Sequence, residues 1–141
     1  MMGGNWGKLL KVDLSSGTTE ELAVDEELYR DYLGGSGLAA KLFFDAEGWK
    51  ADPLSPENPL MIMNGPLSGT ALPGASRLEI CARSPLTGIW GEASMGGHFS
   101  PQLKRTGYDG IVVTGASGKP VYLYVTDEKA EIRDASHLWG K

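Results

Sequence analysis

Alternation of hydrophobic and polar residues marks the beginning of the chain. Residues 6–14 and 18–23 alternate loosely on either side of the turn residues 15–17. This pattern is typical of two strands joined by a tight turn, and it predicts an N-terminal β-hairpin.

Apolar residues at helical spacing follow this hairpin. After Asp25 they predict a short amphipathic helix that ends at Gly34 and Gly35, because glycine is a common C-terminal stop. Ser36 and Gly37 then lead into a second predicted helix over residues 38–46.

Helix signals return twice in the second half of the chain. Ser100 followed by Pro101 is typical of an N-cap and a first helical residue, and Gly107 closes that helix. A last helix is expected from Asp134 or Ser136. The chain stops at Lys141 soon after this start, so we expect it to be a piece of a longer protein.

Runs of β-branched and aromatic residues predict further strands, and glycine and proline separate them. The predicted strands cover residues 60–64, 77–83, 111–114, 121–126 and 131–133, whereas the stretch "WGEASMGG" (90–97) is expected to be a loop. Short strands mixed with a few short helices predict an α+β fold built from antiparallel β-sheets.

Composition adds limits on the class of protein. A chain of 141 residues with 41% hydrophobic and 22% charged residues suits one globular domain, over residues 1–141. The net charge of -5 argues against nucleic acid, and no segment approaches the length of a membrane span. The single cysteine, Cys81, favours a reducing cytoplasm.

Glycine is the unusual feature, because its 20 copies are roughly twice the usual share. They gather in "LGGSGLAAK" (33–41), "NGPLSGTALPGAS" (64–76) and "GEASMGGHFSP" (91–101), two of which run into predicted helix N-termini. Such loops either form tight turns or let a backbone approach an anionic ligand. Neither of these two matches a known nucleotide-binding loop.

Other candidate residues have ordinary interpretations. His98 and His137 lack partners for a triad or a metal site, and Glu92 is more typical of a structural hydrogen bond than of catalysis. Arg77 and Arg83 fall on the same face of one predicted strand. They either clamp a phosphate together or form surface salt bridges.

Seven blocks of the sequence, in order, resemble the N-terminal domain of the tungsten-containing aldehyde:ferredoxin oxidoreductase family. The resemblance covers nearly the whole chain, from Asn5 to Lys141. The blocks are "NWGKLLKVDLSSG", "LGGSGLAAKLFF", "DPLSPENPLMIMNGPLSGT", "RSPLTG", "GEASMGGHFSPQLKRTGYDGIVVTG", "KPVYLYV" and "EIRDASHLWGK".

The resemblance implies a chemistry and its cofactors. Enzymes of that family oxidise aldehydes to carboxylic acids with water as the oxygen source, and pass electrons through a [4Fe-4S] cluster to ferredoxin. The metal is tungsten held by two pterins, which magnesium bridges through their phosphates. The N-terminal domain carries this tungstopterin, and later domains supply the cluster cysteines and the substrate channel. We therefore expect this chain to be inactive by itself.

Site residues follow from the resemblance position by position. Arg77 matches an arginine that contacts the pterin, and the segment Ala93, Ser94, Met95, Gly96 and Gly97 matches the loop that lines it. In that loop the backbone carbonyl of Ser94 would bind the magnesium. The family pattern has Asn at this position, and a further departure places Ser36 where many members have Arg.

Alternatives remain open at this level. One is a stand-alone module that binds a phosphate ligand or nucleotide through the same glycine loops. Another is a relative in the same family that reduces carboxylates or aromatic thioesters. The choice between tungsten and molybdenum is also open, and so is a homodimer.

Overall fold

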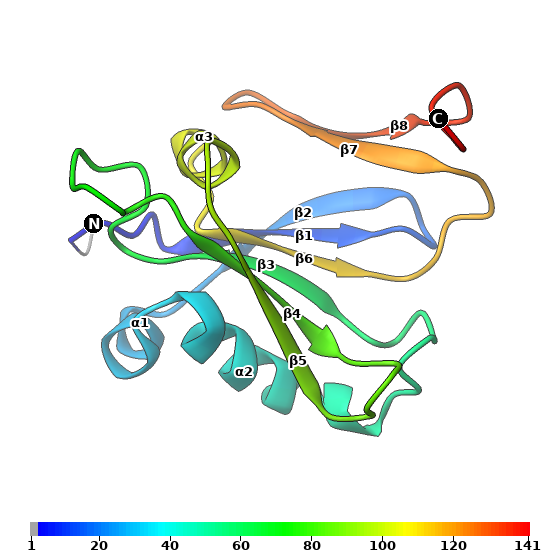
Figure 1. The fold of residues 1–141 in the computed structure, drawn as a ribbon, viewed down its shortest axis with the longest axis horizontal. Coiled ribbons are helices and arrows are strands. Elements are labelled where there is room, and N and C mark those ends of the chain that lie inside the picture. The colour runs from blue at the N-terminus through cyan, green and yellow to red at the C-terminus, as the bar shows by residue number, and fades with distance from the viewer. Residues whose placement is uncertain (1–2) are drawn as a thin grey trace.

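The computed structural model describes residues 3–141 as two β-sheets with short helices around them (Figure 1). The larger sheet has six strands in the order β2-β1-β6-β3-β4-β5, and the smaller sheet is the hairpin β7-β8. The strands are β1 (Lys8–Asp13), β2 (Thr18–Ala23), β3 (Leu60–Asn64), β4 (Leu78–Arg83), β5 (Trp90–Met95), β6 (Gly110–Thr114), β7 (Val121–Val125) and β8 (Ala130–Asp134). The helices are α1 (Glu26–Tyr32), α2 (Gly35–Asp45) and α3 (Phe99–Arg105), with a 3₁₀ turn at Gly48–Lys50.

Neighbouring strands are antiparallel, with one exception. Strand β6 pairs in parallel with β1, in a register that sets Leu10 opposite Ile111. It also pairs antiparallel with β3, so it joins the N-terminal hairpin to the β3-β4-β5 half of the sheet. The predicted α+β class is confirmed, and the parallel pair is an addition that the residue pattern did not indicate.

Both faces of the large sheet are covered (Figure 1). Helices α1 and α2 lie on one face, while α3 and the β7-β8 hairpin lie on the other. Alternate residues of one strand therefore enter different cores: Leu9 packs toward α1 and α2, and Leu10 packs toward the hairpin. Burial on both faces places this sheet between two hydrophobic cores.

The predicted N-terminal elements are confirmed, with one shifted boundary. Helix α2 begins at Gly35 rather than Leu38, and its N-cap is Gly34. Gly34 has a φ of 133° and Gly35 a φ of 54°, values that side chains rarely adopt. These glycines therefore connect α1 to α2 with almost no loop between them.

The predicted loop at 90–97 is wrong over most of its length. Residues Trp90–Met95 form β5, which pairs with β4 from Arg83 opposite Trp90 to Leu78 opposite Met95. Its glycine, alanine and serine have little intrinsic strand preference, so the tertiary pairing with β4 decides the conformation. Only Gly96, Gly97 and His98 form the connection to α3.

Two helix predictions also need correction. The N-cap of α3 is His98 and not Ser100, which lies inside the first turn with only 1% of its surface exposed. The helix expected from Asp134 or Ser136 is absent from the described residues. The chain instead turns, with the Ser136 amide donating to the Asp134 carboxylate at 2.9 Å.

Candidate functional site

The residues predicted to bind the cofactor lie together at one end of the large sheet. Arg77 immediately precedes β4, and Ala93, Ser94 and Met95 end β5. Leu78 pairs with Met95, so continuing this ladder by one residue sets Arg77 opposite Gly96. The Arg77 guanidinium donates a hydrogen bond to the Ser94 hydroxyl at 3.2 Å.

Two features of this region suit an anionic ligand. Arg77 is exposed, and none of the ion pairs within residues 3–141 includes it, so its charge is not neutralised by a carboxylate. Strand β5 is the last strand of its sheet, and one row of its amides and carbonyls is therefore not paired by the sheet. Those groups are available for backbone contacts with a ligand.

The paired glycines after β5 face open space. A side chain added at Gly96 or Gly97 would meet no heavy atom within 4 Å. Gly97 has a φ of 98° and so needs glycine for its backbone, whereas the backbone of Gly96 is acceptable to any residue. Nothing in the chain itself therefore requires glycine at position 96, and the space beside it can admit a flat ligand.

The glycines at the N-cap and in the first turn of α2 are different. A Cβ at Gly34 would lie 3.0 Å from the Asn64 carbonyl oxygen, and one at Gly37 only 2.7 Å from the Tyr32 carbonyl oxygen. These glycines are needed because the backbone of the same chain passes close to them. This segment is a packing and turn element, and Ser36 within it is half-buried.

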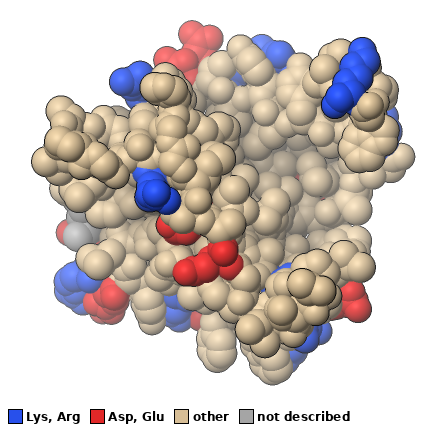
Figure 2. Space-filling view, viewed as in Figure 1, with Lys and Arg blue, Asp and Glu red and all other residues tan. Residues whose placement is uncertain are grey.

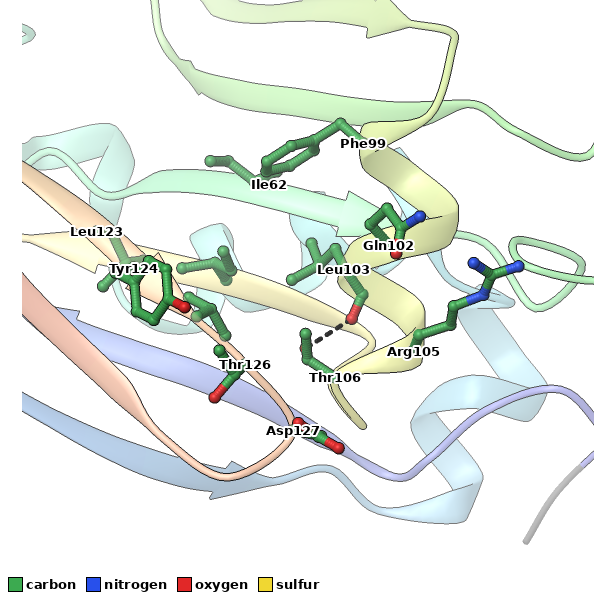
Figure 3. A pocket seen from close by; sticks show the side chains of 12 residues that line it. Ile62, Phe99, Gln102, Leu103, Arg105, Thr106, Leu123, Tyr124, Thr126 and Asp127 are labelled. Atoms are coloured by element: carbon green, nitrogen blue, oxygen red, sulfur yellow. Dashed lines mark hydrogen bonds between the residues drawn. The ribbon is translucent and has the colours of Figure 1, made fainter.

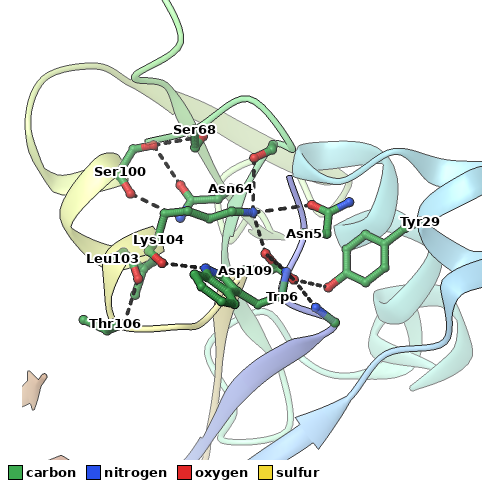
Figure 4. Close-up of polar contacts among 12 residues, drawn as sticks. Asn5, Trp6, Tyr29, Asn64, Ser68, Ser100, Leu103, Lys104, Thr106 and Asp109 are labelled. Atoms are coloured by element: carbon green, nitrogen blue, oxygen red, sulfur yellow. Dashed lines mark hydrogen bonds and ion pairs between the residues drawn. The ribbon is translucent and has the colours of Figure 1, made fainter. Parts of the chain in front are cut away.

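Asn64, Ser68 and Ser100, shown in Figure 4, form a buried polar cluster. Two of its hydroxyl groups contact the backbone of Arg77. The Ser100 hydroxyl lies 2.8 Å from Asn64 Oδ1, 3.1 Å from Ser68 Oγ and 3.2 Å from the Arg77 carbonyl oxygen. The Ser68 hydroxyl also donates to the Arg77 carbonyl at 3.2 Å. Ser68 from the loop after β3 and Ser100 from α3 therefore both contact the backbone of one predicted site residue, and Asn64 of β3 is bonded to Ser100.

A buried ion pair joins the N-terminal segment to α3 and β6 (Figure 4). Asp109, 1% exposed, accepts from Lys104 and from the Tyr29 hydroxyl at 2.7 Å, and the backbone amides of Trp6 and Gly7 complete its partners. Burial and this hydrogen bond raise the pKa of Tyr29. Sequence reasoning missed this cluster, because Tyr29 and Trp6 lie 80 and 103 residues from Asp109 along the chain.

Arg83 does not join Arg77 in a phosphate clamp. Its guanidinium donates to the backbone carbonyls of Gly88 at 2.8 Å and Ala51 at 2.5 Å. Six residues of strand at about 3.3 Å each separate it from Arg77 by roughly 20 Å. Arg83 therefore ties two loops together at the far end of β4, and it forms neither the clamp nor a surface salt bridge.

The remaining candidates stand apart from this region. His137 is exposed in the last turn, and within residues 3–141 no three His, Cys, Asp or Glu side chains gather as metal ligands. Cys81 is fully buried, and burial, with Glu92 and Glu79 nearby, raises the pKa of its thiol to about 12. Metal ligation needs the thiolate, so this thiol is chemically quiet.

A groove of about 580 Å³ lies between α3, the sheet and the β7-β8 hairpin (Figure 3). Phe99 and Leu103 extend from α3 toward the hairpin, while Arg105 is directed away from the groove. None of the predicted cofactor residues lines it. On the molecular face in Figure 2, Lys and Arg side chains are dispersed rather than gathered into one basic patch.

Comparison with known proteins supplies the family. The family described as "Aldehyde ferredoxin oxidoreductase, N-terminal domain" matches residues 9–141. This chain belongs to that family. The resemblance found in the sequence is therefore confirmed over almost all of the chain.

Individual relatives agree with this assignment. The tungsten-containing aldehyde ferredoxin oxidoreductases of Pyrococcus furiosus and Thermococcus kodakarensis are each 50% identical over 140 residues, 99% of this chain and 23% of theirs. Among solved structures, the active site complex BamBC of benzoyl coenzyme A reductase superimposes with a TM-score of 0.97 at 42% identity. That match covers all of this chain and 22% of the other. The chain thus spans about a quarter of the length of these relatives.

Proposed function

We propose that this chain is the cofactor-binding part of an oxidoreductase that oxidises aldehydes to carboxylic acids with ferredoxin as electron acceptor. The 50% identity to tungsten-containing aldehyde ferredoxin oxidoreductases supports the activity. The geometric support is the convergence of an unpaired Arg77, an edge strand and the open Gly96 at one end of the sheet. Aldehyde and ferredoxin are accordingly the proposed partners of the full-length enzyme.

The residues present fit a tungsten bis-pterin with phosphate groups. Arg77 would pair its charge with the anionic part of the cofactor, and the backbone at Gly96 and Gly97 would lie against its flat rings. The Ser94 carbonyl would bind the bridging magnesium, a hard cation that prefers oxygen ligands. The bound metal would supply the oxidation chemistry, while this chain binds and orients the cofactor. Ala93 and Met95 would complete the surface.

The [4Fe-4S] cluster is proposed to lie outside this chain. Cluster iron is held by several cysteine thiolates, and the sequence offers only the buried Cys81. The cluster and the substrate site would then belong to the part of the enzyme that the chain does not span. By itself the chain is proposed to be inactive.

The cellular compartment and the other partners of the enzyme are proposed from its composition. The single cysteine and the net charge of -5 favour the cytoplasm and give no reason to expect nucleic acid as a partner. Among residues 3–141, no helix is both long and apolar enough to cross a membrane. A homodimer stays a prediction.

Two alternative functions have less support. A stand-alone phosphate or nucleotide module is not favoured, because the matching relatives are oxidoreductases of which this chain corresponds to one part. A relative that reduces aromatic thioesters has the BamBC match in its favour, but at 42% identity against 50% for the aldehyde enzymes. Aldehyde oxidation is therefore the better-supported reaction.

Metal analysis and pterin fluorescence of the purified full-length protein test the proposal. We expect tungsten and pterin in a constant ratio, and a protein without tungsten, molybdenum or pterin would refute the cofactor assignment. Molybdenum in place of tungsten would retain the site and change its metal. Arg77→Ala should lower both contents, and unchanged contents would remove Arg77 from the site.

A further inference from the structure

The polar cluster of Asn64, Ser68 and Ser100 is buried and connects segments far apart in sequence. Asn64 ends β3, Ser68 lies in the following loop and Ser100 lies in the first turn of α3, with exposed fractions of 2%, 6% and 1%. Buried polar side chains are costly unless they are hydrogen-bonded, and all three are. Ser68 and Ser100 both contact the Arg77 carbonyl oxygen, and Asn64 is bonded to Ser100.

The Ser100 hydroxyl lies at the centre of this cluster, and it has one hydrogen to donate to its three neighbours. A serine hydroxyl carries one hydrogen but accepts two, so Ser100 donates to only one partner at a time. Its shortest contact is Asn64 Oδ1 at 2.8 Å, and Asn64 Nδ2 donates back to the Ser100 carbonyl at 3.3 Å. Ser68 is then free to donate to the Arg77 carbonyl at 3.2 Å. Removing the Ser100 hydroxyl would leave the buried Asn64 oxygen without this donor.

The cluster also limits the freedom of the glycine turn. Gly96 and Gly97 have the largest conformational freedom of any residue type, and their side-chain positions meet nothing that would hold them. On one side they are anchored by the pairing of Met95 with Leu78, and on the other by Ser100 inside α3. The same hydroxyl group therefore contacts the backbone of Arg77 and fixes the far end of the turn opposite it.

The guanidinium end of Arg77 has a separate support. It donates to the Ser94 hydroxyl at 3.2 Å, an exposed contact on the neighbouring strand. Arg77 is thus held at its backbone carbonyl by Ser68 and at its guanidinium by Ser94. A long, flexible cation whose guanidinium is already held by Ser94 loses less rotamer entropy when it binds an anion.

We propose that Ser100, with Asn64 and Ser68, is a positioning residue for cofactor binding. Ser100, bonded to Asn64, fixes the start of α3 and leaves the Ser68 hydroxyl free to hold the Arg77 carbonyl, so that the guanidinium and the Gly96-Gly97 backbone face the same ligand. The inference rests on the proposed function, because it assigns residues that act through Arg77 rather than touching the cofactor.

The experiment is a double-mutant cycle in the full-length holoenzyme. Ser100→Ala should lower tungsten and pterin per chain by roughly threefold or more, since a buried partner is left unsatisfied. In an Arg77→Ala background the same change should cause little further loss, because residues acting as one unit are not additive. Ser68→Ala should give a smaller loss, because the Arg77 carbonyl oxygen loses a donor while the bond between Ser100 and the buried Asn64 remains.

A matched control separates positioning from general stability. Thr106→Val removes a hydroxyl from the C-cap of the same helix, where Thr106 donates to the Leu103 carbonyl at 2.7 Å. It should leave tungsten and pterin content unchanged. Ser100→Thr keeps a donor and should recover most of the loss. Thermal unfolding of each variant without cofactor measures stability separately. If Ser100→Ala does not fold, the double-mutant cycle is made with Ser68→Ala and Arg77→Ala.

Two results would overturn the inference while leaving the proposed function intact. One is wild-type cofactor content in both Ser100→Ala and Ser68→Ala. The other is a loss that multiplies fully with that of Arg77→Ala, which would show independent action. A wild-type protein without tungsten, molybdenum or pterin would instead refute the proposed function, and this inference would fall with it.

Discussion

Two glycine pairs in this chain look alike in sequence and differ in structure. Gly34-Gly35 connects two helices, and Gly34 is pressed against the Asn64 carbonyl of the same chain. Gly96-Gly97 follows an edge strand, and the space beside both residues is open. The first pair is explained by the fold itself. The second pair is only half explained, because the backbone requires glycine at 97 but not at 96.

The largest loss of stability is expected when the buried ion pair of Lys104 and Asp109 is broken. Asp109→Ala leaves the Lys104 ammonium buried without its counter-charge, and we expect the free energy of unfolding to fall by roughly 3–5 kcal/mol. Denaturant unfolding measures it. The matched control is Glu21→Ala, which breaks the exposed pair with Lys8 and should cost less than about 1 kcal/mol. Equal losses in the two variants would contradict the assignment of Asp109 as a buried anchor.

The next largest effect is expected at the first glycine pair. Gly34→Ala forces a side chain into a φ of 133° and within 3.0 Å of the Asn64 carbonyl oxygen. We expect a loss of about 3 kcal/mol in unfolding free energy, measured by the same denaturant titration. A variant as stable as the wild type would mean that the helix connection relaxes freely, and the contrast between the pairs would disappear.

Gly97→Ala should have a smaller effect on stability. Its φ of 98° strains any side chain, but the surrounding space is open, so the cost should be about 1–2 kcal/mol. Tungsten and pterin content of the full-length protein should fall as well, since the turn would change shape. A loss of unfolding free energy as large as that of Gly34→Ala would mean that a side chain at position 97 meets neighbouring atoms, contrary to the open space beside Gly97.

The smallest effect on stability, and the most informative, is expected at Gly96. Gly96→Ala adds a methyl group into open space at an ordinary φ, so unfolding free energy should change by less than about 0.5 kcal/mol. Tungsten and pterin content should nevertheless fall, because the methyl group occupies the ligand's side of the backbone. Gly118→Ala is the control, since Gly118 also faces open space but lies between β6 and β7. Normal cofactor content in Gly96→Ala would remove Gly96 from the site.

Local patterns were reliable where local forces decide. The hairpin of β1 and β2, the two helices after it and strands β3, β6 and β7 follow from residue spacing and turn residues. Prediction failed at β5 and at Ser100 for the same reason. The small residues of 91–94 become a strand because β4 lies beside them, and Ser100 is drawn into the interior by Asn64 and Ser68.

The candidate site divides in the same way. The resemblance in sequence named Arg77 and residues 93–97, and the pairing of β4 with β5 and the bond from Arg77 to Ser94 then bring them to the same end of the sheet. The pattern of residues could not reveal the cluster of Asn64, Ser68 and Ser100, because its members carry no spacing signal. Nor could it show that Arg83 is occupied with loop carbonyls at the far end of β4.

The family, the α+β class and the positions of the glycine-rich segments follow from the amino-acid sequence alone. Motif order and hydrophobic spacing are properties of the chain, and they need no contact between distant residues. Which glycines are packed, which are open, and how Ser68 and Ser100 contact Arg77 are set by the contacts of the folded chain. Those outcomes depend on contacts between separate segments, such as Gly34 with the Asn64 carbonyl and Ser100 with Arg77, 23 residues away, which local sequence preferences do not encode.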